Sequence, residues 1–160
     1  MSEYFYSYNS PLGEILLGSD GENLTSLKFA NLGEFKGQNL QIFKDTSKWL
    51  DIYFGGNLPN FTPKISANGS EFARSIWEIA LEIPYAKTTT YGEIAHKIAT
   101  KRQIQKMSSR AVGNALGKNP IALIIPCHRV IASGGKIGGY AYGVEKKIAL
   151  LNLEKAQFGF

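Results

Sequence analysis

Residues 90–117, with the sequence TYGEIAHKIATKRQIQKMSSRAVGNALG, predict two short helices separated by a basic loop. Thr90 and Glu93 have the spacing of a capping box, in which each side chain caps a backbone N–H close to the other. The apolar positions that follow recur at helical spacing, which predicts a first helix through Ile98. Two helices joined by a loop within a basic segment are typical of a helix-turn-helix motif.

The second helix of this motif has very little side chain on one face. We predict that it begins after Ser108 or Ser109 and ends at Gly117 with a left-handed C-cap. The face opposite its apolar residues carries Arg110, Gly113, Asn114 and Gly117. A glycine inside a helix lowers helix stability by about 1 kcal/mol relative to alanine, so the glycines on this face require an explanation. One hypothesis is close approach to the minor groove of DNA, which is about 6 Å wide. The alternative is that Gly113 packs against a neighbouring element.

The charges of the chain are distributed unevenly along it. The net charge is +5, yet residues 1–67 hold five Lys and seven Asp or Glu, whereas residues 68–160 hold thirteen Lys or Arg and six Glu. No acidic residue lies between Glu93 and Glu145. That interval contains Lys97, Lys101, Arg102, Lys106, Arg110, Lys118, Arg129 and Lys136. It indicates a polyanionic partner, with nucleic acid as the favoured class, and a solvated basic surface is the alternative.

The first half of the chain predicts a small sheet followed by a helix. Two apolar segments surround Ser19, Asp20 and Gly21, a turn composition, and together they predict a β-hairpin. Residues 40–54 place apolar side chains at roughly helical spacing, which predicts a helix. Residues 55–69 are rich in Gly, Pro and Asn, and we interpret them as a linker between two domains.

Helical patterns dominate the chain after this linker. Asn68 and Glu71 predict a capped helix start, and Pro84 predicts the end of that helix near Ile83. The predicted fold class is therefore α+β. A small antiparallel sheet with a helix occupies residues 1–64, and a mainly helical domain with the helix-turn-helix occupies residues 65–160.

The composition excludes several classes of protein. No apolar run approaches the roughly 18 residues of a membrane span, and the N-terminus lacks the basic and apolar regions of a signal peptide. One cysteine cannot form an internal disulfide, and one cysteine with two histidines argues against a structural zinc site. We therefore expect a cytoplasmic protein without a membrane association or a metal.

The single cysteine lies in a segment with the character of a site wall. Cys127 follows a proline and the apolar run IALII, which we interpret as a buried extended segment, and precedes His128. Five glycines follow within residues 133–143. A thiol becomes a nucleophile only as the thiolate, so it needs a base or a positive field, and His128 is the nearest base in sequence. The alternative is an inert buried cysteine, which is common.

A third group for this site is less clear from the residues alone. Glu154 projects from the last predicted helix beside Leu150 and Leu151, where it could be partly buried and could orient His128. The alternative is a solvated carboxylate near the end of the chain. Arg129 adds positive charge and could be structural or face a phosphate.

Four ordered motifs resemble those of the O6-alkylguanine-DNA alkyltransferases. They are IPYAKTTTYGEIA (residues 83–95), SRAVGNALGKNP (residues 109–120), IPCHRV (residues 125–130) and the glycine-rich loop. The weaker likeness of residues 10–29 to the opening hairpin of that family extends the match to the first half. The resemblance implies a ribonuclease-H-like N-terminal domain and a DNA-binding, alkyl-accepting C-terminal domain.

The resemblance also implies a direct DNA repair reaction. A methyl or other alkyl group passes from O6-alkylguanine, and from O4-alkylthymine, in double-stranded DNA to Cys127, irreversibly and once per molecule. His128 would be the base, acting through a water, and Glu154 would orient it. Tyr91 would protonate or hydrogen-bond the leaving guanine, and Asn119 would brace the active-site turn. The resemblance implies no cofactor, and we expect a monomer.

The remaining roles concern DNA and the base pocket. Arg110 would fill the gap left by a flipped nucleotide. Further DNA contacts are expected from Lys101, Arg102, Ala111, Gly113 and Asn114. The Cys127 and Val130 carbonyls would read the guanine amino group, in a pocket lined by Pro126, Tyr140 and Ala141.

Two departures from the family pattern concern these positions. The loop between Tyr91 and Arg110 is several residues longer than usual, with added basic residues over residues 100–108. Ala141 stands where many members carry serine. Three other functions compete: lesion binding without transfer, which the presence of Cys127 disfavours; a cysteine hydrolase, which leaves the basic interval unexplained; and a sequence-reading regulator, which would need larger side chains on the second helix.

Overall fold

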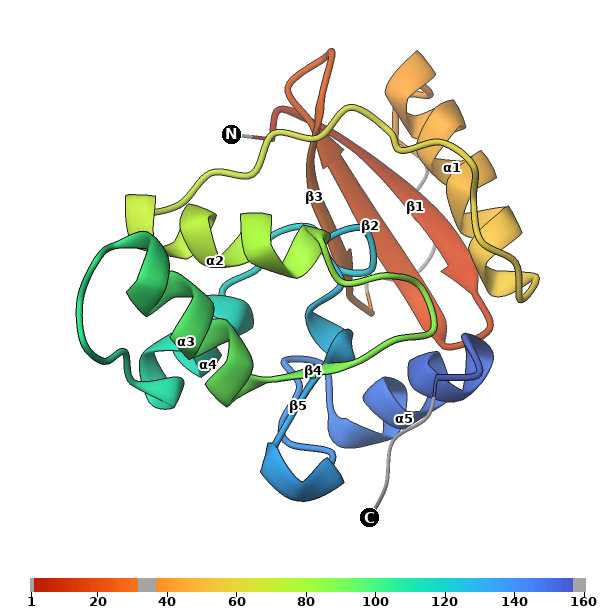
Figure 1. Ribbon diagram of the computed structural model, residues 1–160. Helices are drawn as coiled ribbons and strands as arrows, with labels where there is room; N and C mark the ends of the chain where they lie inside the picture. The colour runs from red at the N-terminus through yellow and green to blue at the C-terminus, as the bar shows by residue number, and fades with distance from the viewer. Residues whose placement is uncertain (1, 32–36, 157–160) are drawn as a thin grey trace. The chain divides into compact units, whose positions relative to one another are not determined.

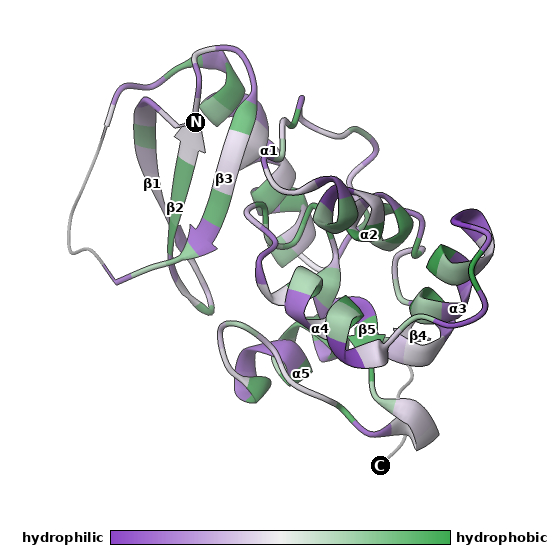
Figure 2. Ribbon diagram, turned by 90° about the vertical axis from the view of Figure 1, so that its left-hand side faces the viewer, coloured by the Kyte–Doolittle hydropathy of each residue, from purple (hydrophilic) through white to green (hydrophobic). Residues whose placement is uncertain are grey.

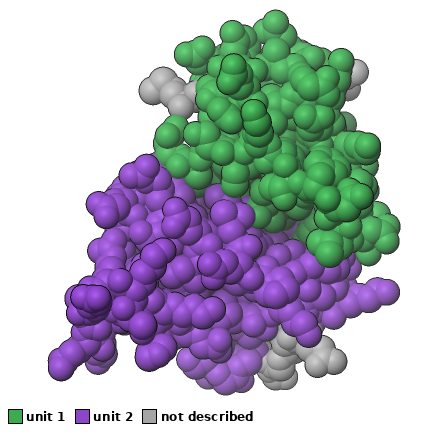
Figure 3. Space-filling model, turned by 45° about the horizontal axis from the view of Figure 1, so that its top comes forward, with its two compact units in different colours: residues 1–68, 120–124 green, residues 69–119, 125–160 purple. Residues whose placement is uncertain are grey.

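The structure is a computed structural model that describes residues 2–31 and 37–156. It divides into two compact units (Figure 3). The first comprises Met1–Asn68 and Pro120–Ile124, and the second comprises Gly69–Asn119 and Ile125–Phe160. The sequence-based division at residue 64 or 65 differs from this one, because it leaves residues 120–124 with the second domain.

The first unit contains a three-stranded antiparallel sheet in the order β1-β2-β3 (Figure 1). The strands are β1 (Tyr4–Ser10), β2 (Gly13–Ser19) and β3 (Leu24–Phe29). The predicted hairpin around Ser19 and Asp20 is confirmed as β2–β3. The first apolar segment contains two strands rather than one, because the chain reverses between Ser10 and Gly13.

Helix α1 (Gln41–Phe54) packs against this sheet and confirms the helix predicted over residues 40–54. Phe43 of α1 stacks on Tyr6 of β1 with ring centroids 5.7 Å apart. Leu50 and Tyr53, two and about three turns further along the same face, are fully buried. The helix is therefore held by its apolar face, as amphipathic helices in proteins usually are.

The segment after Asn119 joins the first unit through β3. The Leu27 N–H donates to the Pro120 carbonyl at 2.9 Å, and the Ala122 N–H donates to the Leu27 carbonyl at 2.9 Å. The prediction of a buried extended run over IALII is half wrong. The residues are buried, but they form turns in which Leu123 has a φ of 70°. Apolar composition predicted the burial, whereas periodicity cannot separate a short strand from a buried turn.

The second unit is built on three helices, α2 (Glu71–Leu81), α3 (Tyr91–Lys101) and α4 (Ser109–Gly117). Each carries an apolar stripe that faces the others (Figure 2). The indole N–H of Trp77 on α2 donates to the Ala115 carbonyl of α4 at 2.9 Å. The pair α3–α4 confirms the predicted helix-turn-helix.

Two of the four predicted capping residues agree with the structure. Thr90 caps α3 by accepting from the Glu93 N–H, and Ser108 caps α4. The cap of α2 is Ser70, which accepts from the Ala73 N–H, and not Asn68. Gly117 is not a left-handed C-cap, because the C-cap of α4 is Lys118 with a φ of −95°.

The rest of the second unit positions the cysteine. Strand β4 (Thr89–Thr90) leads into α3 and pairs in parallel with β5 (Val130–Ile131). The short 3-10 helix η1 (Cys127–Arg129) immediately precedes β5. A second 3-10 turn, η2 (Ser133–Gly135), and the glycine-rich loop then lead to α5 (Val144–Leu153). Within the described ranges 2–31 and 37–156, no helix is long and apolar enough to cross a membrane.

Candidate active site

Cys127 lies at the start of η1, in the wall of a pocket of about 490 Å³. The thiol is buried, with 7% of the residue exposed. The Asn119 side-chain N–H donates to Cys127 Sγ at 3.2 Å and to the Ile125 carbonyl at 2.9 Å. One amide therefore ties the turn that precedes the cysteine to the sulfur itself.

Burial raises the pKa of the Cys127 thiol, because a low-dielectric site disfavours the thiolate. The Asn119 hydrogen bond, the charge of Lys147 and the backbone N–H groups of Cys127 and His128 lower the pKa in opposition. The site is therefore a pocket in which a buried thiol has donors and a positive charge close to the sulfur. Such donors stabilise negative charge as it develops on the attacking atom.

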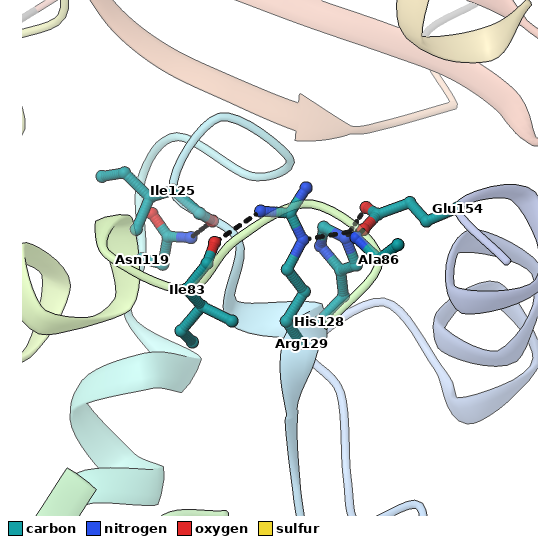
Figure 4. Close-up of polar contacts among 7 residues, drawn as sticks. All are labelled: Ile83, Ala86, Asn119, Ile125, His128, Arg129 and Glu154. Carbon is teal, nitrogen blue, oxygen red and sulfur yellow. Dashed lines mark hydrogen bonds and ion pairs between the residues drawn. The ribbon is translucent and has the colours of Figure 1, made fainter. Parts of the chain in front are cut away.

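His128 and Glu154 form a buried pair in this site (Figure 4). His128 Nε2 lies 2.6 Å from Glu154 Oε2, and both side chains are fully buried. An ionised carboxylate only accepts hydrogen bonds, so Nε2 carries the proton in the neutral ring and Nδ1 is the basic nitrogen. Glu154 thus fixes the tautomer of His128 as well as its orientation.

The solvated alternative for Glu154 is wrong. The residue is 1% exposed, and its Oε1 accepts from Arg129 Nε at 2.8 Å and from the Ala86 N–H at 3.0 Å. Burial alone would raise the pKa of Glu154, but the hydrogen bonds and charges of His128 and Arg129 hold it at about 2. The carboxylate is therefore ionised at neutral pH.

Tyr91, the first residue of α3, lies beside the glycine-rich loop. Its hydroxyl donates to the Gly139 carbonyl at 3.3 Å. Gly138, with a φ of 72°, passes so close that an added Cβ would lie 3.1 Å from the Tyr91 hydroxyl oxygen. The absence of a side chain at Gly138 thus leaves room for the phenol at the pocket wall.

Lys147 of α5 is a site residue that the sequence analysis missed. The side chain is fully buried, and Nζ donates to the Val130 carbonyl at 2.6 Å and to the Gly139 carbonyl at 2.9 Å. Nζ also lies 5.7 Å from the centre of the Tyr91 ring. Burial lowers the pKa of Lys147 to about 8, against the opposing effect of Cys127. The ammonium joins β5, the glycine-rich loop and α3 at one point.

The slim face of α4 forms one side of the pocket. The pocket is lined by Tyr91, Ser109, Arg110, Gly113, Asn114, Leu116, Gly117, Cys127, Gly139, Tyr140 and Ala141. A Cβ at Gly113 would meet only the Tyr91 ring, at 3.9 Å, and a Cβ at Gly117 would meet nothing within 4 Å. Packing inside the second unit therefore does not require either glycine, which removes the internal-packing explanation for Gly113.

The structure also places three other predicted residues, Pro126, Tyr140 and Ala111. Pro126 is the N-cap residue of η1, and the Tyr140 ring packs edge-on against Tyr142 with centroids 5.6 Å apart. Ala111 is a half-buried residue of α4.

Lys101 and Arg102 lie at the end of α3 and have partners on α2. Lys101 Nζ lies 3.7 Å from Glu78, and Arg102 lies 5.1 Å from the centre of the Phe72 ring. The exposed Lys101–Glu78 pair contributes little to stability. Both basic side chains therefore lie at the start of the long loop.

Sequence reasoning left Arg129 open and missed Lys147 for the same reason. A charged residue in a sequence is expected at the surface, and only the fold shows that carbonyls and a carboxylate surround it. One signal was available for Lys147. It lies between apolar residues of a helix in which Leu150 and Leu151 are buried, at the spacing that places it on their face.

Fold and site together define a helix-turn-helix protein with a buried, hydrogen-bonded cysteine beside a histidine–carboxylate pair. Residues 71–156 match the family model of the 6-O-methylguanine DNA methyltransferase DNA-binding domain, and residues 4–67 match that of its ribonuclease-like domain. The chain therefore belongs to the 6-O-methylguanine DNA methyltransferase family.

Individual relatives match along almost the whole chain. A methylated-DNA–protein-cysteine methyltransferase of Methanosarcina acetivorans is 43% identical over 158 residues, covering 94% of this chain and 97% of the relative. The enzyme of the same name from Mycobacterium leprae is 37% identical, covering 94% and 92%. The crystal structure of Mycobacterium tuberculosis OGT in complex with DNA superposes with a TM-score of 0.82 at 38% identity, covering 94% and 92%.

Proposed function

We propose that this protein repairs DNA by moving an alkyl group from O6-alkylguanine to its own Cys127. The observation that most directly supports this proposal is the buried Cys127 thiol in the wall of a pocket that the helix-turn-helix lines. The thiol accepts a hydrogen bond from Asn119 and lies close to the His128–Glu154 pair. Family membership over residues 4–67 and 71–156 supports the same reaction. A thioether does not release its alkyl group, so each molecule acts once.

The chemistry follows from the order of these groups. The thiol proton passes through a water to His128 Nδ1, while Glu154 stabilises the imidazolium that forms. The Cys127 sulfur forms a bond to the alkyl carbon as the bond from that carbon to O6 breaks. Tyr91 supplies a proton or hydrogen bond to the leaving guanine, so the protein gains the alkyl group in place of a proton. The lesion is the alkyl donor, and no cofactor is needed.

The reaction requires an extrahelical base, because a stacked duplex does not offer O6 to a thiol at a useful angle. Flipping a nucleotide costs a few kcal/mol, and less at a damaged base. We propose that α4 lies in the minor groove with Gly113 and Asn114 against the DNA, and that Arg110 fills the vacated space. The absence of any packing need for Gly113 supports this placement.

The base pocket offers groups that suit a purine. The carbonyls of Cys127 and Val130 accept hydrogen bonds from the guanine amino group. The Val130 carbonyl also accepts a hydrogen bond from Lys147 Nζ. The buried Tyr140 hydroxyl has no hydrogen-bond partner among the described residues. Ala141 provides a backbone N–H but no hydroxyl. O4-alkylthymine presents a similar alkyl–oxygen bond, and we include it as a substrate.

The surroundings of the site suit a DNA substrate. We propose that Lys101, Arg102 and Lys106 contact phosphates, so affinity for DNA falls steeply with salt. A single reduced thiol suits the cytoplasm, where disulfides are rare. We propose a monomer there.

Incubation with DNA that contains O6-methylguanine tests the proposal. One methyl mass is expected on the tryptic peptide that contains Cys127, and none on Cys127→Ser. The Cys127→Ser variant is expected to retain binding to the modified duplex. A wild-type protein that binds this DNA and gains no mass would instead be a lesion-binding protein.

A further inference from the structure

The carboxylate of Glu154 is shared by donors from two separate segments of the second unit. His128 Nε2 forms a hydrogen bond with Oε2, whereas Arg129 Nε and the Ala86 N–H both donate to Oε1 (Figure 4). The two oxygens thus have separate tasks. The pair proposed for catalysis is therefore one half of a larger buried network.

Arg129 is itself held on more than one side. Its Nη1 donates to the Ile83 carbonyl at 2.9 Å, and its guanidinium lies 5.6 Å from the centre of the Tyr85 ring. The residue is 8% exposed. A guanidinium with this many fixed contacts presents a rigid donor to Glu154, which the flexible ammonium of a lysine does not.

The segment from Ile83 to Ala86 is shaped to the same carboxylate. Ala86 has a φ of 65°, a left-handed conformation that is uncommon for a residue with a side chain. In this conformation its N–H donates to Glu154 Oε1 at 3.0 Å. Backbone strain of this kind persists only where the surroundings enforce it. The network thus includes a backbone donor as well as Arg129.

We infer that Arg129 is a positioning residue for the His128–Glu154 pair: it occupies one carboxylate oxygen, leaves the other to His128, and offsets the carboxylate charge so that the imidazole stays neutral. A neutral imidazole is the form that can accept the thiol proton. This inference rests on the proposed function, because it concerns the base of that reaction.

The charges around His128 agree with this inference. Burial lowers the pKa of His128, the hydrogen bond and charge of Glu154 raise it, and the charges of Arg129 and Lys147 lower it. Other titratable groups of this region are Cys127 on η1 and four tyrosines that sense the charge of Cys127 or Glu154: Tyr85, Tyr91, Tyr140 and Tyr142. Without Arg129, the full charge of Glu154 would act on the ring and favour the imidazolium.

The chain has two histidines, which makes the test direct. The ring signals of His128 and of the exposed His96 can be followed by NMR during a pH titration, with His96 as the internal reference. Arg129→Met is expected to raise the pH at which His128 protonates, whereas Arg129→Lys, which keeps the charge but not the rigid guanidinium, restores only part of the wild-type behaviour. Arg74→Met, the same change at an exposed position of α2, is expected to leave the titration curves of both histidines unchanged.

Repair kinetics supply the second measurement. The ratio of methyl-transfer rates at about pH 8.5 and about pH 6.5 should rise about threefold or more in Arg129→Met, because removal of a nearby like charge raises the pKa of His128 and leaves less neutral imidazole at the lower pH. Equal loss at both pH values, with unchanged His128 titration in the folded variant, would overturn the inference. If Arg129→Met does not fold, Tyr85→Leu should show a smaller shift of His128 in the same direction, and no shift there overturns it.

The NMR titration does not depend on alkyl transfer. A wild-type protein that transfers no methyl group would therefore end the proposed function, while the titration of His128 would still decide whether Arg129 controls the ring.

Discussion

At the scale of single residues, the site is organised by buried charges that hold backbone carbonyls and each other. Lys147 satisfies the carbonyls of Val130 and Gly139, and Gly139 also accepts from Tyr91. A buried cation costs free energy unless it has such partners. Its position suggests a second effect, since its charge lowers the pKa of the Cys127 thiol.

Removal of the Lys147 charge is expected to make Cys127 less reactive near neutral pH. Lys147→Met should slow alkylation of the thiol by iodoacetamide about threefold or more below the midpoint of the pH profile, because the thiolate loses an opposite charge. Lys136→Met removes an exposed positive charge and serves as the control. A parallel drop at every pH, including alkaline pH, would indicate a loss of structure and contradict this electrostatic role.

At the scale of elements, glycines in α4 lower its intrinsic helix stability and leave one of its faces with little side chain. Gly113 lies inside the helix, and an added Cβ would make only an ordinary contact with Tyr91. Internal packing therefore does not explain the glycine, while the position of Arg110 and Asn114 on the same pocket suits a surface that meets DNA.

Gly113→Ala is expected to stabilise the second unit by about 0.5–1 kcal/mol, since alanine is the better helix former and the site has room for its methyl group. The same variant should bind duplex DNA more weakly, because the methyl group separates α4 from the groove. Thermal unfolding and fluorescence anisotropy measure the two effects. Gain of stability with unchanged DNA affinity would contradict the placement of α4 in the groove.

Arg110→Ala tests the wedge on the same helix. It is expected to slow methyl transfer from duplex DNA more than reaction with free O6-benzylguanine, because the free base needs no flipping. Both rates can be measured on Cys127 by mass spectrometry. Equal losses on the two substrates would argue against a role for Arg110 in holding the flipped state.

At the scale of the whole molecule, the buried network is expected to make the free energy of unfolding decrease as the pH falls. The folded-state pKa values of Glu154 and His128 are both lowered, so the folded chain binds fewer protons than the unfolded chain. The contribution of His128 is present above its unfolded pKa of about 6.5 and is lost as the pH falls below it. The contribution of Glu154 is present above 4.5 and is lost as the pH falls towards about 2.

The second unit is therefore expected to lose stability as the pH falls from about 6.5 to about 2. Glu154→Gln should lower stability at neutral pH and flatten the slope below about pH 5. Trp77 lies in the second unit, so its fluorescence in a Trp49→Phe background reports on that unit. Identical slopes for wild type and Glu154→Gln would contradict the assignment.

Local patterns in the sequence were sufficient to place the helices. Capping residues such as Thr90 and Ser108, and apolar spacing along α1 and α2, act between residues a few positions apart, so they can be seen in the chain itself. The motif around Cys127 also identified the family. By contrast, the turns of residues 121–125 have the composition of a strand, and only their pairing with Leu27 shows what they form.

By itself, then, the sequence predicted the two-part fold and the helix-turn-helix, and it identified the cysteine that we propose as the alkyl acceptor. Only the tertiary structure decided the contacts of Arg129 and Lys147, and the burial of Glu154. The physical reason is that a charge can remain buried only where partners surround it, and these partners come from residues 83–86, 128–130, 139 and 154, which only folding brings together.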